Sequence, residues 1–308
     1  MGNGSATADK GKTIMPYLFL IVSVLLCVTK SSAYNIYAKG EKPNLHGVFR
    51  FNFVSYALAC VFLFLLSIGG SISMPTVFCA LGYAVIVLLL QSLMVFAMKS
   101  GSMATVSLLN VYGMVIPAIA GPIFWKEPFG ILQGIGLVAM ILSIFFLNEE
   151  TQTKENGTET EKGNKLWILL GACCFLLSGL AGLMEKMHQS TSAKGERFEF
   201  LALAYATMFL LSLSVCLSTK KQATPPADKK RFLFSALSVG VVAGVYSSVN
   251  LYLAGTLDSL VYFPVANGGA LLLTVFISIV VFREKLKKKK AVGFILGLLS
   301  VILLCIPS

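Results

Sequence analysis

Residues 75–98, PTVFCALGYAVIVLLLQSLMVFAM, contain no Asp, Glu, Lys or Arg. A helix needs about 20 mainly apolar residues to cross the hydrocarbon core of a bilayer. Backbone groups in that layer have no water to bond, so a helix is the simplest way for one segment to satisfy them. This stretch therefore predicts a membrane-spanning helix.

The same pattern recurs along the whole chain of 308 residues, of which 56% are hydrophobic and 13% charged. Soluble domains carry about 25% charged residues, so this composition excludes a disordered protein, a nucleic-acid-binding domain and almost any cytosolic enzyme. We predict an all-α integral membrane protein with ten transmembrane helices. The apolar runs are 14–38, 49–69, 75–98, 103–124, 129–147, 166–187, 198–217, 232–254, 260–282 and 291–306.

The net charge of +11 belongs to the segments between these runs. Lys and Arg number eighteen in the loops after the odd-numbered runs and six in the termini and the other loops, with Lys30 inside the first run. The positive-inside rule then places both termini outside the cytoplasm. The family resemblance given below favours termini inside, so the orientation stays open.

Cysteine and histidine are placed in ways that argue against a metal or haem site. The seven cysteines all lie in apolar runs without metal-site spacing, and the two histidines, His46 and His188, lie far apart in the sequence. We expect no cofactor and no metal.

The N-terminal residues 1–13 form a polar tail before the first run. The small residues Ser31, Ser32 and Ala33 leave a cleaved signal peptide as an alternative for this region. The repeat described next favours a retained first helix, because it needs that helix to complete its first copy.

The chain aligns with itself. The segments that open the second and seventh runs, Arg50-Phe-Asn-Phe and Arg197-Phe-Glu-Phe, resemble each other. A shift of 147 also pairs Lys39 with Lys186, and a shift of 157 pairs Ser102 with Ser259, Asn110 with Asn267, Glu127 with Glu284 and Gly136 with Gly293. Chance similarity between Leu-rich helices is the alternative, but the matches fall on polar residues that membrane spans use sparingly.

The repeat predicts the domain organisation. Residues 14–147 form a first five-helix repeat, 148–165 a polar linker, and 166–306 a second five-helix repeat. Because five is odd, the second copy crosses the membrane in the opposite sense, and such inverted repeats are typical of secondary transporters.

Taken together, these features resemble the drug/metabolite transporter superfamily in its EamA-type ten-span branch. The residues that carry the resemblance are Arg50 and Arg197, the glutamates in Trp125-Lys-Glu-Pro128 and Phe282-Arg-Glu-Lys285, and the Gly-rich helices that follow those glutamates. The resemblance implies a transporter over roughly residues 14–306 and says nothing specific of the substrate. Lys30 departs from the pattern, because the family usually has a small residue there.

Polar residues inside apolar runs are costly, so each is a functional hypothesis. Lys30 lies about two-thirds along the first run and is a candidate anchor for an anionic or zwitterionic substrate, with snorkelling to the interface as the alternative. Tyr34 is four residues further on and shares its helix face. It is a second candidate, although tyrosine is also common at the interface.

Further substrate-binding candidates lie in repeat-related runs: Gln91, Asn110, Tyr246, Asn250 and Asn267. Asparagine amides donate and accept hydrogen bonds. Pro117, Pro264 and Gly268-Gly269 weaken the helices around Asn110 and Asn267, and freed backbone groups beside a cavity suit ligand binding. Hydrogen bonding between helices is the alternative role.

Glu185 and Glu199 are the candidates for proton coupling. The alternative for Glu185 is a neutralising pair with its neighbour Lys186. We expect Glu127 and Glu284 to be structural residues that cap or pin their turns.

We therefore predict a multi-pass transporter in a cell membrane, the plasma membrane being favoured, that moves a small metabolite by alternating access. An anionic, zwitterionic or aromatic substrate is favoured, and the alternatives are a multidrug or cationic-compound exporter of the same fold and a non-transporting receptor or scaffold. An enzyme is not expected, because no nucleophile or acid–base cluster is present. The expected partners are the substrate and the lipid bilayer, not nucleic acid, and a homodimer is left open.

Overall fold

A computed structural model describes residues 4–40, 45–100, 109–148, 165–219, 228–280 and 288–306. The described residues form helices joined by short connections and contain no strand. The helices are α1 (Gly4–Gly40), α2 (Leu45–Leu66), α3 (Met74–Ser100), α5 (Val115–Phe124), α6 (Ile131–Asn148), α8 (Lys165–Gln189), α9 (Arg197–Ser218), α10 (Lys229–Thr256), α11 (Ser259–Val280) and α12 (Lys288–Leu304).

Seven of the described helices, α1, α2, α3, α8, α9, α10 and α11, are long and apolar enough to cross a membrane. Three shorter apolar helices lie at Leu109–Phe124, Ile131–Phe146 and Ala291–Leu304. The chain is thus an all-helical, multi-pass integral membrane protein. Each apolar run predicted from the sequence overlaps one of these helices. α1 begins at Gly4, so it includes most of the tail that was predicted to precede the first span.

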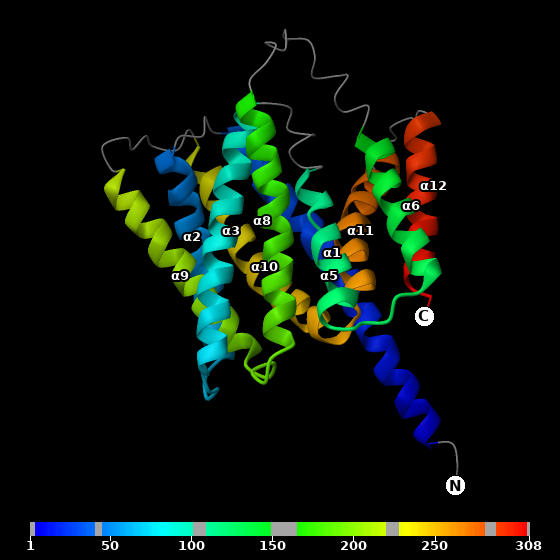
Figure 1. The fold of residues 1–308 in the computed structure, drawn as a ribbon. Helices are drawn as coiled ribbons and strands as arrows, with labels where there is room; N and C mark the ends of the chain where they lie inside the picture. The colour runs from blue at the N-terminus through cyan, green and yellow to red at the C-terminus, as the bar shows by residue number, and fades with distance from the viewer. Residues whose placement is uncertain are drawn as a thin grey trace.

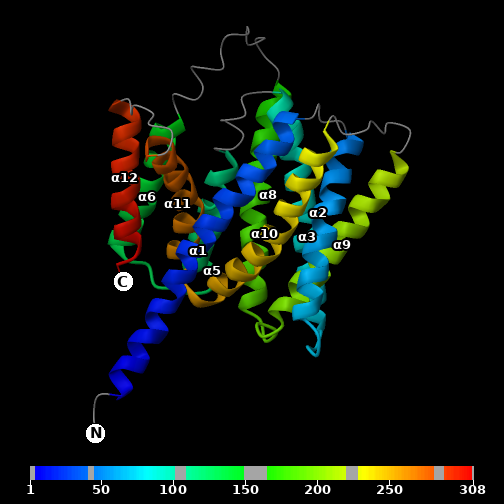
Figure 2. The same ribbon diagram turned by 180° about the vertical axis from the view of Figure 1, so that it is seen from behind.

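The helices form a bundle, and different segments of the chain lie at its two ends (Figure 1). α1 begins and α12 ends at the lower end of Figures 1 and 2, which we call the termini end. The connections 67–73, 125–130, 190–196 and 257–258 also lie there. The opposite end holds the last turn of α1 and the first turns of α2 and α10.

Helix packing follows a regular scheme. α2 packs against α9, α5 against α11, and α6 against α12, while α1 packs on α10 and α3 on α8. The scheme is unchanged when the two halves are exchanged, with α1, α2, α3, α5 and α6 taking the places of α8, α9, α10, α11 and α12. Each packed pair then maps onto itself or onto another pair of the scheme. Matched helices also run in opposite directions: α1 rises in Figure 1, whereas α8 descends.

Small residues allow close contact between α10 and α2. A Cβ atom at Gly240 would lie 2.6 Å from the carbonyl oxygen of Ser55, and one at Gly244 would lie 2.8 Å from the ring of Phe62. This glycine spacing, four residues apart on α10, permits the close approach of the two helices.

The helix that contains Asn110 is interrupted. Residues 109–112 are helical, a turn follows at Gly113 and Met114, and α5 then begins at Val115. α11 instead continues through Pro264, Gly268 and Gly269. The predicted weakening of the backbone is therefore visible beside Asn110, and the helix around Asn267 is continuous.

Candidate functional site

Tyrosine side chains from six helices gather where the two halves of the bundle meet. We call this group, with the polar residues it contacts, the tyrosine cluster. Its tyrosines are Tyr34 (α1), Tyr56 (α2), Tyr83 (α3), Tyr205 (α9), Tyr246 (α10) and Tyr262 (α11). Tyrosine is common at membrane interfaces, so six hydroxyls directed at one interior region mark a polar centre inside an apolar bundle.

Lys30 faces this cluster and not the lipid. Its Nζ lies 4.1 Å from the centroid of the Tyr246 ring. A cation over an aromatic face is attracted by the ring quadrupole, and the attraction grows when both groups leave water. The structure therefore places Lys30 at the polar centre and not in a snorkelling position.

Gln91 joins α3 to α1 and α2. Its side-chain oxygen accepts hydrogen bonds from the hydroxyls of Tyr34, at 2.7 Å, and Tyr56. The Tyr56 ring also packs edge-on against Tyr205, with centroids 5.8 Å apart. The candidates Gln91 and Tyr34 thus meet directly.

Glu185, near the end of α8, supplies the acidic group of the cluster. Its side chain accepts a hydrogen bond from the Tyr83 hydroxyl at 3.0 Å and also interacts with Tyr262. The residue is only 8% exposed. Lys30 lies close enough for the two charges to interact, yet the two groups do not form an ion pair.

A further hydrogen bond ties α10 to α1. Asn250 accepts a hydrogen bond from Ser23 at 2.5 Å and lies next to Tyr246, which also contacts Cys27. The candidates Tyr246 and Asn250 therefore share one helix face, as their spacing predicts. All seven cysteines, Cys27 included, are free thiols.

Three other candidates are placed outside the cluster. Asn267 donates to the carbonyl oxygen of Phe263 in its own helix at 2.9 Å. The buried side-chain oxygen of Asn110 has no hydrogen-bond partner among the described residues. Glu199, in the first turn of α9, lies against Gly70 at the termini end.

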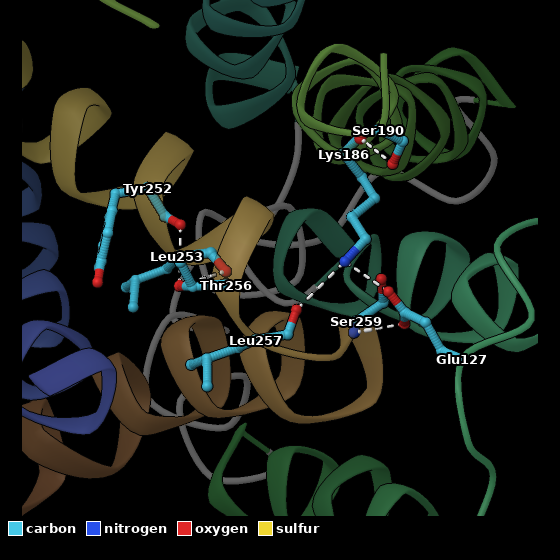
Figure 3. Close-up of polar contacts among 8 residues, drawn as sticks. All are labelled: Glu127, Lys186, Ser190, Tyr252, Leu253, Thr256, Leu257 and Ser259. Atoms are coloured by element: carbon cyan, nitrogen blue, oxygen red, sulfur yellow. Dashed lines mark hydrogen bonds and ion pairs between the residues drawn. The ribbon is translucent and has the colours of Figure 1, made fainter. Parts of the chain in front are cut away.

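Glu185 and Lys186 do not form the neutralising pair that was the alternative for them. Lys186 instead binds Glu127 at 2.5 Å, and its ammonium also donates to the carbonyl oxygen of Leu257 at 3.2 Å. Glu127 in turn accepts the backbone N–H of Ser259 at 2.7 Å (Figure 3). The expected pinning role of Glu127 thus extends beyond its own turn to two other segments; Glu284 lies outside the described residues.

A second polar network lies at the same end. The carboxylate of Glu196 accepts hydrogen bonds from the Ser73 N–H at 2.9 Å, the Ser73 hydroxyl at 2.8 Å, and the Thr76 hydroxyl. These hydrogen bonds, that of Thr76 first, lower the pKa of Glu196 below its ordinary value. Thr76 also lies 3.2 Å from Nε2 of the fully buried His188.

Asp258 stands beside the Glu127–Lys186 pair, in the connection between α10 and α11. Burial and the nearby charge of Glu127 raise the pKa of Asp258, while the charge of Lys186 opposes that rise. The termini end therefore carries several interacting charges.

At the opposite end of the bundle, aromatic side chains join the first half of the chain to the second. Tyr37 of α1 stacks on Phe51 of α2, with centroids 3.9 Å apart, and Phe232 of α10 meets both edge-on. Arg50 lies over the Phe232 ring at 5.0 Å. The chemistry that joins the two halves thus differs between the ends.

The candidates chosen from the sequence omit four of the six tyrosines of the cluster. Tyr56, Tyr83, Tyr205 and Tyr262 were not selected, and neither was Cys27. A signal was available for three of them: Tyr56, Tyr83 and Tyr205 each lie at least seven residues from either end of an apolar run. Tyr262 lies only two residues after the start of its run. Tyrosine needs a partner for its hydroxyl when buried, so mid-span tyrosines predict a shared polar region.

One groove on the outside of the bundle is unrelated to this chemistry. It lies between α6 and α12 and has apolar lining residues that include Ile131, Ile135 and Val138, all strongly exposed. Such a face suits lipid chains. Among the described residues there is also no group of three or more His, Cys, Asp or Glu side chains that could hold a metal ion.

Residues 15–149 match the EamA-like transporter family. The resemblance to the drug/metabolite transporter superfamily is thereby confirmed. This EamA-like segment includes Lys30, Tyr34 and Gln91 together with the cluster members Tyr56 and Tyr83.

Fold comparison extends the likeness to the second half. One solved crystal structure matches with a TM-score of 0.71, covering 94% of this chain and 96% of the other, at 11% sequence identity. At that identity the match shows a shared fold and nothing of the substrate. No curated protein matches the sequence.

Proposed function

We propose that this EamA-like protein is a secondary transporter that moves a small metabolite by alternating access, with the plasma membrane as its location. Its architecture would be ten transmembrane helices in two inverted five-helix repeats. The helix pairs that map onto one another when the halves are exchanged support this proposal, as do the opposite directions of matched helices. Inverted repeats of this kind place the substrate between the halves.

The observation that carries the proposal is the arrangement of Lys30 and Glu185. Opposite charges stand in one tyrosine-rich cluster between the halves, and among the described residues neither has an ion-pair partner. A charge inside the membrane costs about 2.5–3.5 kcal/mol on insertion scales. A ligand with complementary charges would offset that cost for both groups.

This arrangement favours a small zwitterion that carries an aromatic or apolar part. Its anionic group would bind Lys30 and its cationic group Glu185, while the rings of Tyr246 and Tyr56 pack on the rest. A purely anionic substrate would use Lys30 alone. A lipophilic cation is disfavoured, because Lys30 would repel it.

Glu185 is the better of the two candidates for proton coupling. It is buried within the cluster, where a proton and a cationic substrate group would compete for the same carboxylate. Glu199 lies at the termini end without a contact to the cluster among the described residues.

Counterflow in proteoliposomes tests the proposal. A thermal-shift screen of the purified protein against zwitterions, anions and organic cations first identifies ligands, because a bound ligand raises the unfolding temperature. Vesicles loaded with a ligand should then accumulate its labelled form. Lys30→Ala should lower that uptake strongly, while Lys194→Ala, which removes an exposed lysine, leaves it intact. Binding without counterflow would favour a receptor, and uptake restricted to lipophilic cations would favour an exporter of cationic compounds.

A further inference from the structure

We propose that the end of α8, residues 185–189, is a gate that closes the tyrosine cluster at the termini end and is coupled to the occupancy of Glu185. The inference rests on the proposed transport function and adds the element that controls access from one side. Two groups of polar contacts carry it, and in each group a carboxylate from one half of the chain binds residues of the other half.

The first group centres on Lys186. The residue is bound by Glu127, which belongs to the connection 125–130 of the first half, whereas Leu257 and Ser259 belong to the second half. Figure 3 shows the Lys186 ammonium between the Glu127 carboxylate and the Leu257 carbonyl. Both charged side chains are only 10% exposed, so their attraction is weakly screened by water.

The backbone before Glu127 is strained. Lys126 has a φ of 54°, a left-handed conformation that costs a residue with a Cβ free energy. Such strain persists only where the surrounding contacts hold it, and it is typical of functional segments. The ion pair of Glu127 with Lys186 and its bond from Ser259 supply contacts of that kind.

The internal repeat keeps the residue types of this group. The partners of Lys186, Ser259 and Glu127 in the sequence alignment are Lys39, Ser102 and Glu284. Polar and charged residues are used sparingly in and beside membrane spans, so the recurrence of all three types in both halves favours a shared role.

The second group centres on His188 and Glu196. Ser73 and Thr76, at the start of α3 in the first half, bind the Glu196 carboxylate, and Thr76 also contacts His188. His188 packs on the ring of Phe200, with centroids 4.3 Å apart. The end of α8 is thus held to α3 on one side and to the connection 125–130 on the other.

Position in the chain couples the gate to the cluster. Glu185 and Lys186 are adjacent on one helical turn, so their side chains point in different directions: Glu185 to Tyr83 and Lys186 to Glu127. Any movement of this turn that releases Lys186 also moves Glu185. A ligand that binds Glu185 therefore changes the stability of the closed gate, as alternating access requires.

Labelling of Cys27 tests the gate without knowledge of the substrate. Cys27 contacts Tyr246 in the cluster. In a variant that retains this cysteine alone, with the other six replaced by alanine, a membrane-impermeant maleimide is added to the termini side of proteoliposomes of known orientation. We expect Glu127→Gln and Lys186→Met each to raise the labelling rate about fivefold. The exchanged pair Glu127→Lys with Lys186→Glu should bring the rate back toward the unmodified value.

The matched control is Lys194→Met, which removes an exposed lysine from the same end. Unchanged labelling in both single variants overturns the gate, and so does an equal rise in the control. If one single variant fails to fold, the other single variant and the exchanged pair remain as the test. A folded exchanged pair that is labelled as fast as the remaining single variant would also overturn the gate. Faster labelling of the single variants without counterflow of any ligand would support the gate and refute the transport proposal. Counterflow with unchanged labelling would support transport and refute the gate.

Discussion

Glu185 and Lys186 are neighbours in the sequence but bind different parts of the molecule. Glu185 accepts a hydrogen bond from Tyr83 inside the tyrosine cluster, and Lys186 forms an ion pair with Glu127 at the termini end. The two residues connect the centre of the bundle with its closure at one end. The predictions below test the centre, the closure and the packing separately.

Replacement of Lys30 tests the anchor. Lys30→Ala removes the cation that faces Tyr246, and we expect uptake of anionic and zwitterionic ligands to fall by about tenfold or more, because an anionic group would then be buried without a partner. Initial rates in proteoliposomes measure the effect, and Lys30→Arg should keep part of the activity. Equal rates in Lys30→Ala and the unmodified protein would refute the anchor.

Glu185→Gln tests proton coupling. The amide keeps the size of the side chain and accepts the Tyr83 hydrogen bond, but it cannot release a proton. We expect uptake driven by a pH gradient to be lost. Counterflow, which needs no net proton movement, should continue at a higher ligand concentration that offsets the loss of the carboxylate. Gradient-driven uptake that survives in Glu185→Gln would move attention to Glu199, for which Glu199→Gln is the matching variant.

Gln91→Leu tests the hydrogen bonds at the centre. The change leaves the hydroxyls of Tyr34 and Tyr56 without their acceptor, and a buried unsatisfied group costs about 1–3 kcal/mol. A lower unfolding temperature in detergent should report that loss. Ser92→Ala is the neighbouring control, because the Ser92 hydroxyl bonds only to its own helix among the described residues; a similar fall in both variants would contradict the prediction.

Gly240→Val tests the close contact of α10 with α2. The added atoms would overlap the Ser55 carbonyl and the Leu58 side chain, and such overpacking costs about 1–3 kcal/mol. Unfolding temperature is again the measurement. Gly195→Ala, where an added Cβ meets no atom within 4 Å, should be neutral. A stable Gly240→Val protein would show that the two helices can separate without cost.

The pH dependence of stability tests the Glu196 network. Because the pKa of Glu196 is lowered, its ionised form stabilises the folded protein above its ordinary pKa, and this contribution disappears as the pH falls through the lower folded value. The difference in unfolding temperature between the unmodified protein and Glu196→Gln should therefore be constant near neutral pH and shrink below about pH 4.5. The raised pKa of Asp258 acts in both proteins and cancels in the comparison. A difference that stays constant in acid would refute the network.

The sequence predicted the helices well, because their signal is the length of an apolar run. Residues 75–98, for example, fall within the helix Met74–Ser100. The start of α1 was missed, since polar residues such as Lys10 and Lys12 interrupt the apolar pattern but do not prevent a helix. The turn at Gly113 and Met114 was foreseen only as a weakness near Asn110.

The site was predicted in part. Lys30, Tyr34, Gln91 and Glu185 are unusual residues within spans, and that alone identifies them. Their partners depend on which helices meet, and the apolar pattern of a membrane helix hides its inner face because lipid and protein interior are equally apolar. The pairing of Lys186 with Glu127, 59 positions apart, has no local signal and needed the fold.

The unlike chemistry of the two ends has a consequence for experiments in different buffers. Dissolved ions screen the largely buried pair of Lys186 and Glu127 only slightly, but they affect the stacking of Tyr37 with Phe51 still less. Raising the ionic strength should therefore loosen one face of the protein more than the other. Salt would then act as a directional bias, so that rates measured in opposite directions across the same vesicle respond unequally to it.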